Sequence, residues 1–142
     1  MIGCRRMVHQ LLPNTKVVYS NNRFHFIREN NLCFSLESTN LVRFFYWCKN
    51  EIPPNEKRRD LWNQMWGPFS IANTHSTQVV VDMLIYNGRF TLGVEKYVKN
   101  YKGLTFKTGN RIEIDDYDID WILSSFKSFY LKCIRYSSIC LK

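Results

Sequence analysis

Hydrophobic residues recur with two different periods along the chain, and the two periods alternate twice. A period near 3.6 residues, typical of a helix with one buried side, begins at Leu41 and again at Ile119. Shorter runs, rich in apolar residues and partly alternating with polar ones, precede each of these helices and are typical of strands. The order predicts an α+β protein made of two strands-then-helix units, each of the form ββββα with its antiparallel sheet packed against helices.

The helix of the second unit is predicted from Ile119 onward. Carboxylates at a helix start stabilise free backbone N–H groups and the positive end of the dipole. The helix of the first unit has Ser38 or Thr39 as its N-cap and is stopped by Pro53 and Pro54. A third, weaker helix is predicted between these two, from Glu56 to Trp66. The aspartates that mark the start of the second unit's helix are Asp115, Asp116, Asp118 and Asp120.

Strands of the second unit are predicted at Val79–Tyr86 and Arg89–Val98, joined by a tight turn at Asn87-Gly88. Leu104–Ile114 is either one further strand or a hairpin of two short ones. In Arg89–Val98 the alternation predicts a buried side and a solvated side. The buried side carries Phe90, Leu92 and Val94, and the solvated side carries Arg89, Thr91, Glu95 and Tyr97. The first unit has strand-like runs at Met7–Leu12, Lys16–Tyr19, Arg23–Ile27 and Leu32–Leu36.

A short motif recurs in the two units. The segments Tyr19-Ser-Asn-Asn-Arg-Phe24 and Tyr86-Asn-Gly-Arg-Phe90 both place a turn before an Arg-Phe pair at a strand start. Either the motif marks an internal repeat, which the recurring helix favours, or it is a turn that many antiparallel proteins use. We divide the chain into a first unit at 1–50, a connector with a helix at 51–76, and a second unit at 77–142.

Charge and cysteine content narrow the class of protein. The 142 residues carry a net charge of +8, which either favours a polyanionic partner or only keeps a small protein in solution. Five cysteines without CxxC spacing argue against disulfides and a zinc site, and favour a reducing compartment, nuclear or cytoplasmic. We expect no membrane span, because no apolar run approaches the required length of roughly 18 residues, and the first 12 residues are too polar for a signal peptide.

The segment from Thr77 to Phe129 follows a known pattern. It consists of Tyr86–Val98 (YNGRFTLGVEKYV), Lys107–Ile114 (KTGNRIEI) and Trp121 on the following helix. This pattern resembles the single-stranded-DNA-binding domain of the positive cofactor 4 family of transcriptional coactivators, which has a four-stranded antiparallel sheet followed by one helix. The chain departs from the family at Val98, where the family has a tryptophan, and at Asn87, where it has a basic residue.

The first unit carries a fragment of the same pattern at Cys33–Leu41 (CFSLESTNL). The resemblance therefore implies either an intramolecular pseudo-dimer, similar to the Whirly proteins, or a homodimer as in the coactivator family. It also implies a sequence-tolerant binder of single-stranded DNA or RNA in transcription or genome maintenance, with proteins of the transcription machinery as further partners. Abundant Asn and Lys beside few Gly and Pro fit an AT-rich genome, such as that of a virus.

Single strands are held by cations along the phosphates and by aromatic rings on which bases stack. The resemblance favours Arg89 and the Lys107–Arg111 strand for the phosphates, with Tyr86 and Tyr97 as stacking rings. Each residue has an alternative role, because strand lysines are often only solvated and strand-end tyrosines often cover a core. Tyr101 is a further candidate for base stacking. Lys96 is the weakest candidate for phosphate contact, because it falls on the same side of its strand as Phe90 and Val94. The candidate nucleic-acid-binding residues are Tyr86, Arg89, Tyr97, Lys99, Lys102, Lys107, Arg111, Arg23 and Arg28.

Two other functions remain open. The departures at Val98 and Asn87 favour a structural or protein-interaction module that keeps the fold without binding nucleic acid. The aspartates Asp115 and Asp116 would be the metal ligands of a nuclease, although they fit helix capping better. The three histidines lack metal-ligand spacing, and no P-loop, dinucleotide fingerprint or nucleophile elbow is present. We therefore expect no enzyme activity, no metal and no cofactor.

Overall fold

The computed structural model describes residues 6–58, 60–86, 89–115 and 119–140. Within them the chain forms two four-stranded antiparallel sheets, in which sequence neighbours pair in the orders β1-β2-β3-β4 and β5-β6-β7-β8. The prediction of an α+β protein with two such sheets is confirmed. The first half contains β1 (Met7–Leu12), β2 (Thr15–Ser20), β3 (Arg23–Arg28), β4 (Asn31–Leu36) and α1 (Ser38–Glu51). The rest contains α2 (Asn55–Arg58), β5 (Gln64–Asn73), β6 (Thr77–Tyr86), β7 (Arg89–Lys99), β8 (Thr105–Asp115) and α3 (Ile119–Cys140).

The predicted alternation of β7 is confirmed on its buried side. Phe90, Leu92 and Val94 are all buried, and they lie opposite Ile85, Met83 and Val81 of β6. Leu104–Ile114 forms one strand, β8, rather than two. The first helix starts differently from the prediction. Glu37, not Ser38 or Thr39, is its N-cap, and Asn40 Oδ1 accepts the backbone N–H of Glu37 at 2.8 Å.

The predicted helix from Glu56 to Trp66 is wrong. Among the described residues of this span only Glu56, Lys57 and Arg58 are helical, as the end of α2, and β5 begins at Gln64, inside the segment predicted as a connector. β5 pairs with β6 through two register shifts, one of them around Gly67-Pro68. Register shifts move side chains from one side of a strand to the other. The hydrophobic pattern of β5 consequently has no regular alternation that sequence reading could detect.

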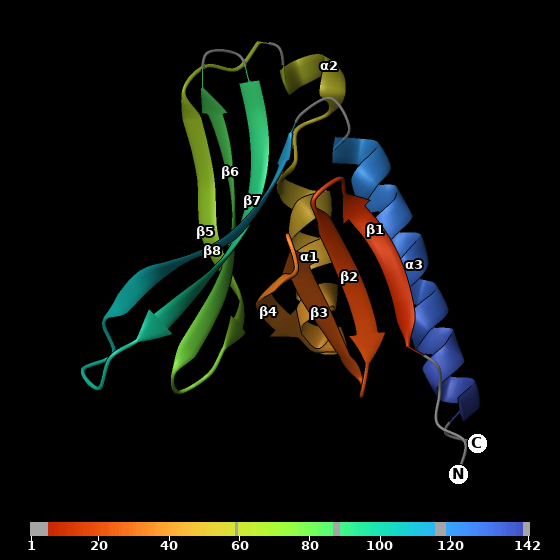
Figure 1. Cartoon of the computed structure of the whole chain (residues 1–142). Helices are drawn as coiled ribbons and strands as arrows, with labels where there is room; N and C mark the ends of the chain where they lie inside the picture. Colours follow the sequence, from red (N-terminus) through yellow and green to blue (C-terminus); the bar gives the residue numbers. More distant parts are fainter. Residues whose placement is uncertain (1–5, 59, 87–88, 116–118, 141–142) are drawn as a thin grey trace.

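The helix of each half packs against the sheet of the other half, an arrangement that we call the exchange of α1 and α3. α1 packs against β5 of the second sheet, where the Trp47 and Phe69 rings stack with centroids 6.1 Å apart. α3 packs against β1 of the first sheet, where the His9 and Phe129 rings stack at 5.0 Å. Figure 1 shows α1 between the two sheets and α3 beside β1. Each sheet thus has the helix of the other half on its apolar side, and α3 also contacts β8 of its own half.

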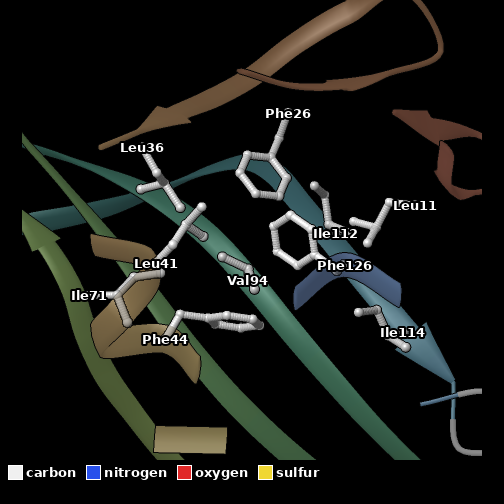
Figure 2. A pocket seen from close by; sticks show the side chains of 10 residues that line it. All are labelled: Leu11, Phe26, Leu36, Leu41, Phe44, Ile71, Val94, Ile112, Ile114 and Phe126. Atoms are coloured by element: carbon white, nitrogen blue, oxygen red, sulfur yellow. The ribbon is translucent and has the colours of Figure 1, made fainter. Parts of the chain in front are cut away.

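One hydrophobic core serves both halves. Figure 2 shows Phe126 of α3 among Phe26 of the first sheet and Ile112 and Ile114 of the second. The space that these and neighbouring apolar side chains enclose is about 20 Å³, which is too small for a ligand. The core is therefore packed rather than hollow.

The recurring motif has the same position in both halves. In each sheet it links the second and third strands, and its phenylalanine, Phe24 or Phe90, is buried. Asn87 and Gly88, the predicted turn of the second copy, lie outside the described residues. The arginine of the motif pairs with a carboxylate at the end of the last strand or directly after it. Arg23 contacts Glu37 at 3.0 Å, and Arg89 contacts Asp115 at 2.8 Å. The two halves thus share the order of their strands and helix, the place of this motif between the second and third strands, and this ion pair.

A hydrogen bond between the halves gives a first prediction. The Ser38 and Tyr130 hydroxyl oxygens of α1 and α3 are 2.8 Å apart. Tyr130→Phe removes this bond, and we expect it to lower the free energy of unfolding by about 0.5–1.5 kcal/mol. The measurement is the midpoint of urea unfolding at unchanged slope. Tyr46→Phe, at an exposed position of α1, is the matched control, and equal midpoints for the two variants would mean that the bond contributes nothing.

Candidate nucleic-acid interface

The hairpin of β7 and β8 is longer than its counterpart in the first half. β7 and β8 have eleven residues each, whereas β3 and β4 have six. The added length forms a projecting arm, drawn in teal at the lower left of Figure 1. We define the arm as Tyr97–Lys107. It contains three of the candidate lysines and one candidate tyrosine, which the fold brings together on one hairpin: Lys99, Lys102, Lys107 and Tyr97.

The arm combines positive charge with exposed rings. No aspartate or glutamate occurs between Glu95 and Glu113. Tyr101 at the tip is 90% exposed and Phe106 is 52% exposed, which is unusual for large apolar rings on a paired strand. Lys102 Nζ lies 5.6 Å from the centre of the Tyr101 ring. Lysines and exposed aromatic rings are thus interspersed along the arm.

The strand register sorts the arm's side chains into two sides. Tyr97 lies opposite Lys107, and Lys99 lies opposite Thr105, so these four share one side. Val98 lies opposite Phe106 on the other side, and both are exposed. One side of the arm is therefore cationic with a tyrosine, and the other is apolar.

Hydrogen bonds hold the arm in place. Lys99 Nζ donates to Asn73 Oδ1 and, at 2.8 Å, to the carbonyl oxygen of Thr74, which ties the arm to the β5–β6 turn. At the tip, Asn100 Oδ1 accepts the backbone N–H groups of Lys102 and Leu104, both at 2.9 Å. The amino group of Lys99 is thus used within the chain. Lys107, by contrast, makes no hydrogen bond or ion pair with any residue that the structure describes.

Arg111 is enclosed by carboxylates. Its guanidinium contacts both oxygens of Asp82, at 2.7 and 3.0 Å, and also Glu95 at 3.1 Å and Glu113 at 2.9 Å. These contacts, led by the hydrogen bond to Asp82 and opposed by burial, raise the pKa of Arg111 above its ordinary value. Three carboxylates around one cation leave this part of the sheet negative. The placement argues against the predicted phosphate contact of Arg111.

The same cluster corrects the predicted solvated side of β7. Glu95 is only 3% exposed and Asp82 only 8%. The Arg111 side chain crosses Gly93 of β7, where any larger side chain would collide with the guanidinium. This side of β7 therefore faces away from the core and is nevertheless covered, by an arginine from the neighbouring strand.

The other candidate residues lie away from the arm. Arg89 and Tyr86 lie opposite each other and are exposed at the other end of the sheet. Arg89 is ten residues from Lys99 along β7, which corresponds to roughly 30 Å. Arg23 is held by Glu37 and by the carbonyl oxygen of Ser35. Arg28 donates to the carbonyl oxygens of Arg111 and Gly109, so it joins β3 to β8. The structure thus divides the predicted residues into the arm and separate structural contacts.

The aspartate cluster has structural contacts where it is described. Asp115 pairs with Arg89, and Asp120 pairs with the buried Arg58 at 2.9 Å. Asp116 and Asp118 fall outside the described residues. Among the described residues, no group of three or more His, Cys, Asp and Glu side chains is placed to hold a metal ion.

The described cysteines are packed as apolar groups. Cys33, Cys48 and Cys133 are free and buried. Burial raises the pKa of Cys48 and of Cys133 to about 12 in each case, so these two thiols are protonated near neutral pH. Cys4 is outside the described residues, and nothing in the structure bears on the side chain of Cys140.

A scan against protein-family models and a search of curated proteins give no match for this chain. The helices in the described part of the chain include none that is both long and apolar enough to cross a membrane.

Phe106, which is exposed on the arm, was not among the residues predicted from the sequence. The available signal was the long stretch between Glu95 and Glu113, where lysines and rings alternate without an acidic residue.

Proposed function

We propose that the chain binds single-stranded nucleic acid with little sequence preference, and that the β7–β8 arm is its principal contact surface. The arm supports this proposal because it joins exposed rings to lysines without any acidic residue. Single strands expose the faces of their bases to such rings and their phosphates to such cations, whereas a duplex keeps its bases stacked inside. The proposal includes no catalytic step.

The arrangement of the two halves bears on the proposed family. Two ββββα units that share one core are the arrangement expected of an intramolecular pseudo-dimer. This supports a kinship with positive cofactor 4-like and Whirly-like proteins, which we retain as a proposal. A role in transcription or genome maintenance rests on that kinship alone.

A second candidate function is supported by the apolar side of the arm. Val98 and Phe106 are 40% and 52% exposed, and Leu104 at the tip is 58% exposed. Apolar residues gathered on a projecting hairpin are a feature of protein interfaces. If the chain is an interaction module, this side would contact a protein and the lysines would only keep the arm soluble.

A salt titration separates the two functions. For single strands, the logarithm of the association constant falls by roughly 0.7 per neutralised phosphate for each tenfold rise in salt concentration. If the arm neutralises two or three phosphates, we expect a slope of roughly −1.4 to −2.1. The measurement is fluorescence anisotropy with labelled single-stranded DNA, single-stranded RNA and the matching duplex. Failure to bind at low salt, or tighter binding of the duplex, would refute the proposal and favour the interaction module.

A further inference from the structure

A polar cleft lies between the two sheets, beside the base of the arm. Its volume is about 410 Å³, within the range of roughly 300–1,000 Å³ that is typical of small-ligand sites. Both halves contribute to its wall. The charged and amide side chains that line it are Arg23, Glu37 and Asn40 from the first half, and Asn73, Lys96 and Asn110 from the second.

Lys96 is placed unusually for a lysine. It lies opposite Val79 of β6, on the side of β7 that carries Phe90, Leu92 and Val94 in the core. The core ends after Val94, and Lys96 lines the cleft instead. The residue is half-buried, and its amino group has no hydrogen bond or ion pair with the described residues. A cation partly removed from water without a counter-ion is unfavourable, so the site favours an anion.

The remaining groups of the cleft also suit an anion. Arg23 is paired with Glu37, so the three charged side chains together leave one positive charge. The side-chain amide of Asn110 makes no hydrogen bond with the described residues and has two N–H donors to offer. The amide of Asn40 is already used, because its Nδ2 donates to the carbonyl oxygen of Ile71.

We propose that this cleft binds a phosphate group, with the Lys96 amino group as its central contact and the Asn110 amide beside it. Lys96 directly precedes the arm, on the side of β7 that carries Val98 with Phe106 opposite, so the end of a single strand that stacks on the exposed Phe106 ring can reach the cleft. The terminal phosphate of a nucleic-acid strand is therefore the source of phosphate that we favour, and this part of the proposal rests on the proposed function. A mononucleotide or inorganic phosphate offers the same chemistry.

The first test uses the full chain and four labelled single strands of one sequence, with a 5′-phosphate, a 3′-phosphate, both or neither. We expect a strand with one of the two terminal phosphates to bind about tenfold more tightly than the strand with neither, the effect of one charge-assisted hydrogen bond. Lys96→Gln should abolish this difference, and it should weaken binding of the unphosphorylated strand only by the loss of long-range attraction that removal of one positive charge causes. Lys102→Gln, on the arm, is the control, and it should weaken all four strands equally. Equal affinities of the wild-type protein for all four strands would overturn the strand-end proposal.

The second test needs neither an oligonucleotide nor a variant that must fold. Inorganic phosphate and a nucleoside monophosphate are titrated into the ¹⁵N-labelled full chain at constant ionic strength. We expect saturable chemical-shift changes at Lys96 and at the Asn110 side-chain amide, and none with chloride. Such changes without any strand binding would support the cleft and refute the proposed function. Equal affinity for strands with and without terminal phosphates, together with no chemical-shift changes on addition of phosphate, would refute the cleft as a phosphate site and leave the proposed function intact.

Discussion

Replacement of Arg111 with alanine is expected to lower the free energy of unfolding by about 3–5 kcal/mol, the usual effect of removing one partner from a buried ion pair. Asp82 and Glu95 would lose their cation while they stay largely buried, with side chains only 11% and 4% exposed. Urea unfolding followed by circular dichroism measures the change.

Arg89→Ala is the matched control for this prediction. It removes an arginine from an ion pair on the same side of the same sheet, but the Arg89 side chain is 70% exposed. Water and salt screen such a pair, so stability should change little. If Arg111→Ala were as stable as Arg89→Ala, the enclosed cluster would not be structural, and the predicted phosphate contact of Arg111 would be open again.

The second large effect is expected on the arm. The triple variant Tyr101→Ala, Lys102→Gln, Lys107→Gln removes one exposed ring and two cations without touching Lys99, which anchors the arm. Stacking contributes about 1–3 kcal/mol per base, and each phosphate contact adds to the affinity at low salt. We expect single-strand affinity at about 50 mM salt to fall roughly 100- to 1,000-fold, and the salt slope to flatten by roughly 1.4.

A control triple variant on the helices removes the same chemistry elsewhere. Tyr46→Ala, Lys49→Gln, Lys127→Gln takes one exposed ring and two lysines from α1 and α3. It has the same net charge as the arm variant, so it should show the same loss of long-range attraction. An equal loss of affinity in both triple variants would mean that net charge, and not the arm, determines binding.

The parts of the fold that were predictable are those with regular hydrophobic periods. β7 alternates over its buried residues, and α3 has a continuous apolar side, so both follow from local pattern. β5 was missed because its register shifts break the alternation. The exchange of α1 and α3 between the halves was not predictable, since amphipathic patterns show which side is buried and not which sheet covers it.

The candidate site was predictable as a set of residues but not as a surface. The alternation of β7 placed Glu95 on the side of the strand away from the core, where it lies, but predicted it to be solvated, whereas it is buried. The pattern could not show that Glu95 contacts Arg111, because that contact depends on the register between β7 and β8. The arm likewise follows from the length of this hairpin beyond its counterpart, and the cleft at Lys96 from the packing of the two sheets.

Mapping the contact by NMR tests the central claim most directly. The ¹⁵N-labelled chain, of 17.0 kDa, is titrated with a short single-stranded oligonucleotide at low salt. We expect the largest chemical-shift changes within Tyr97–Lys107 and small changes around the Asp82–Arg111 cluster. Changes centred on α1 and α3, or no saturable change at all, would contradict it.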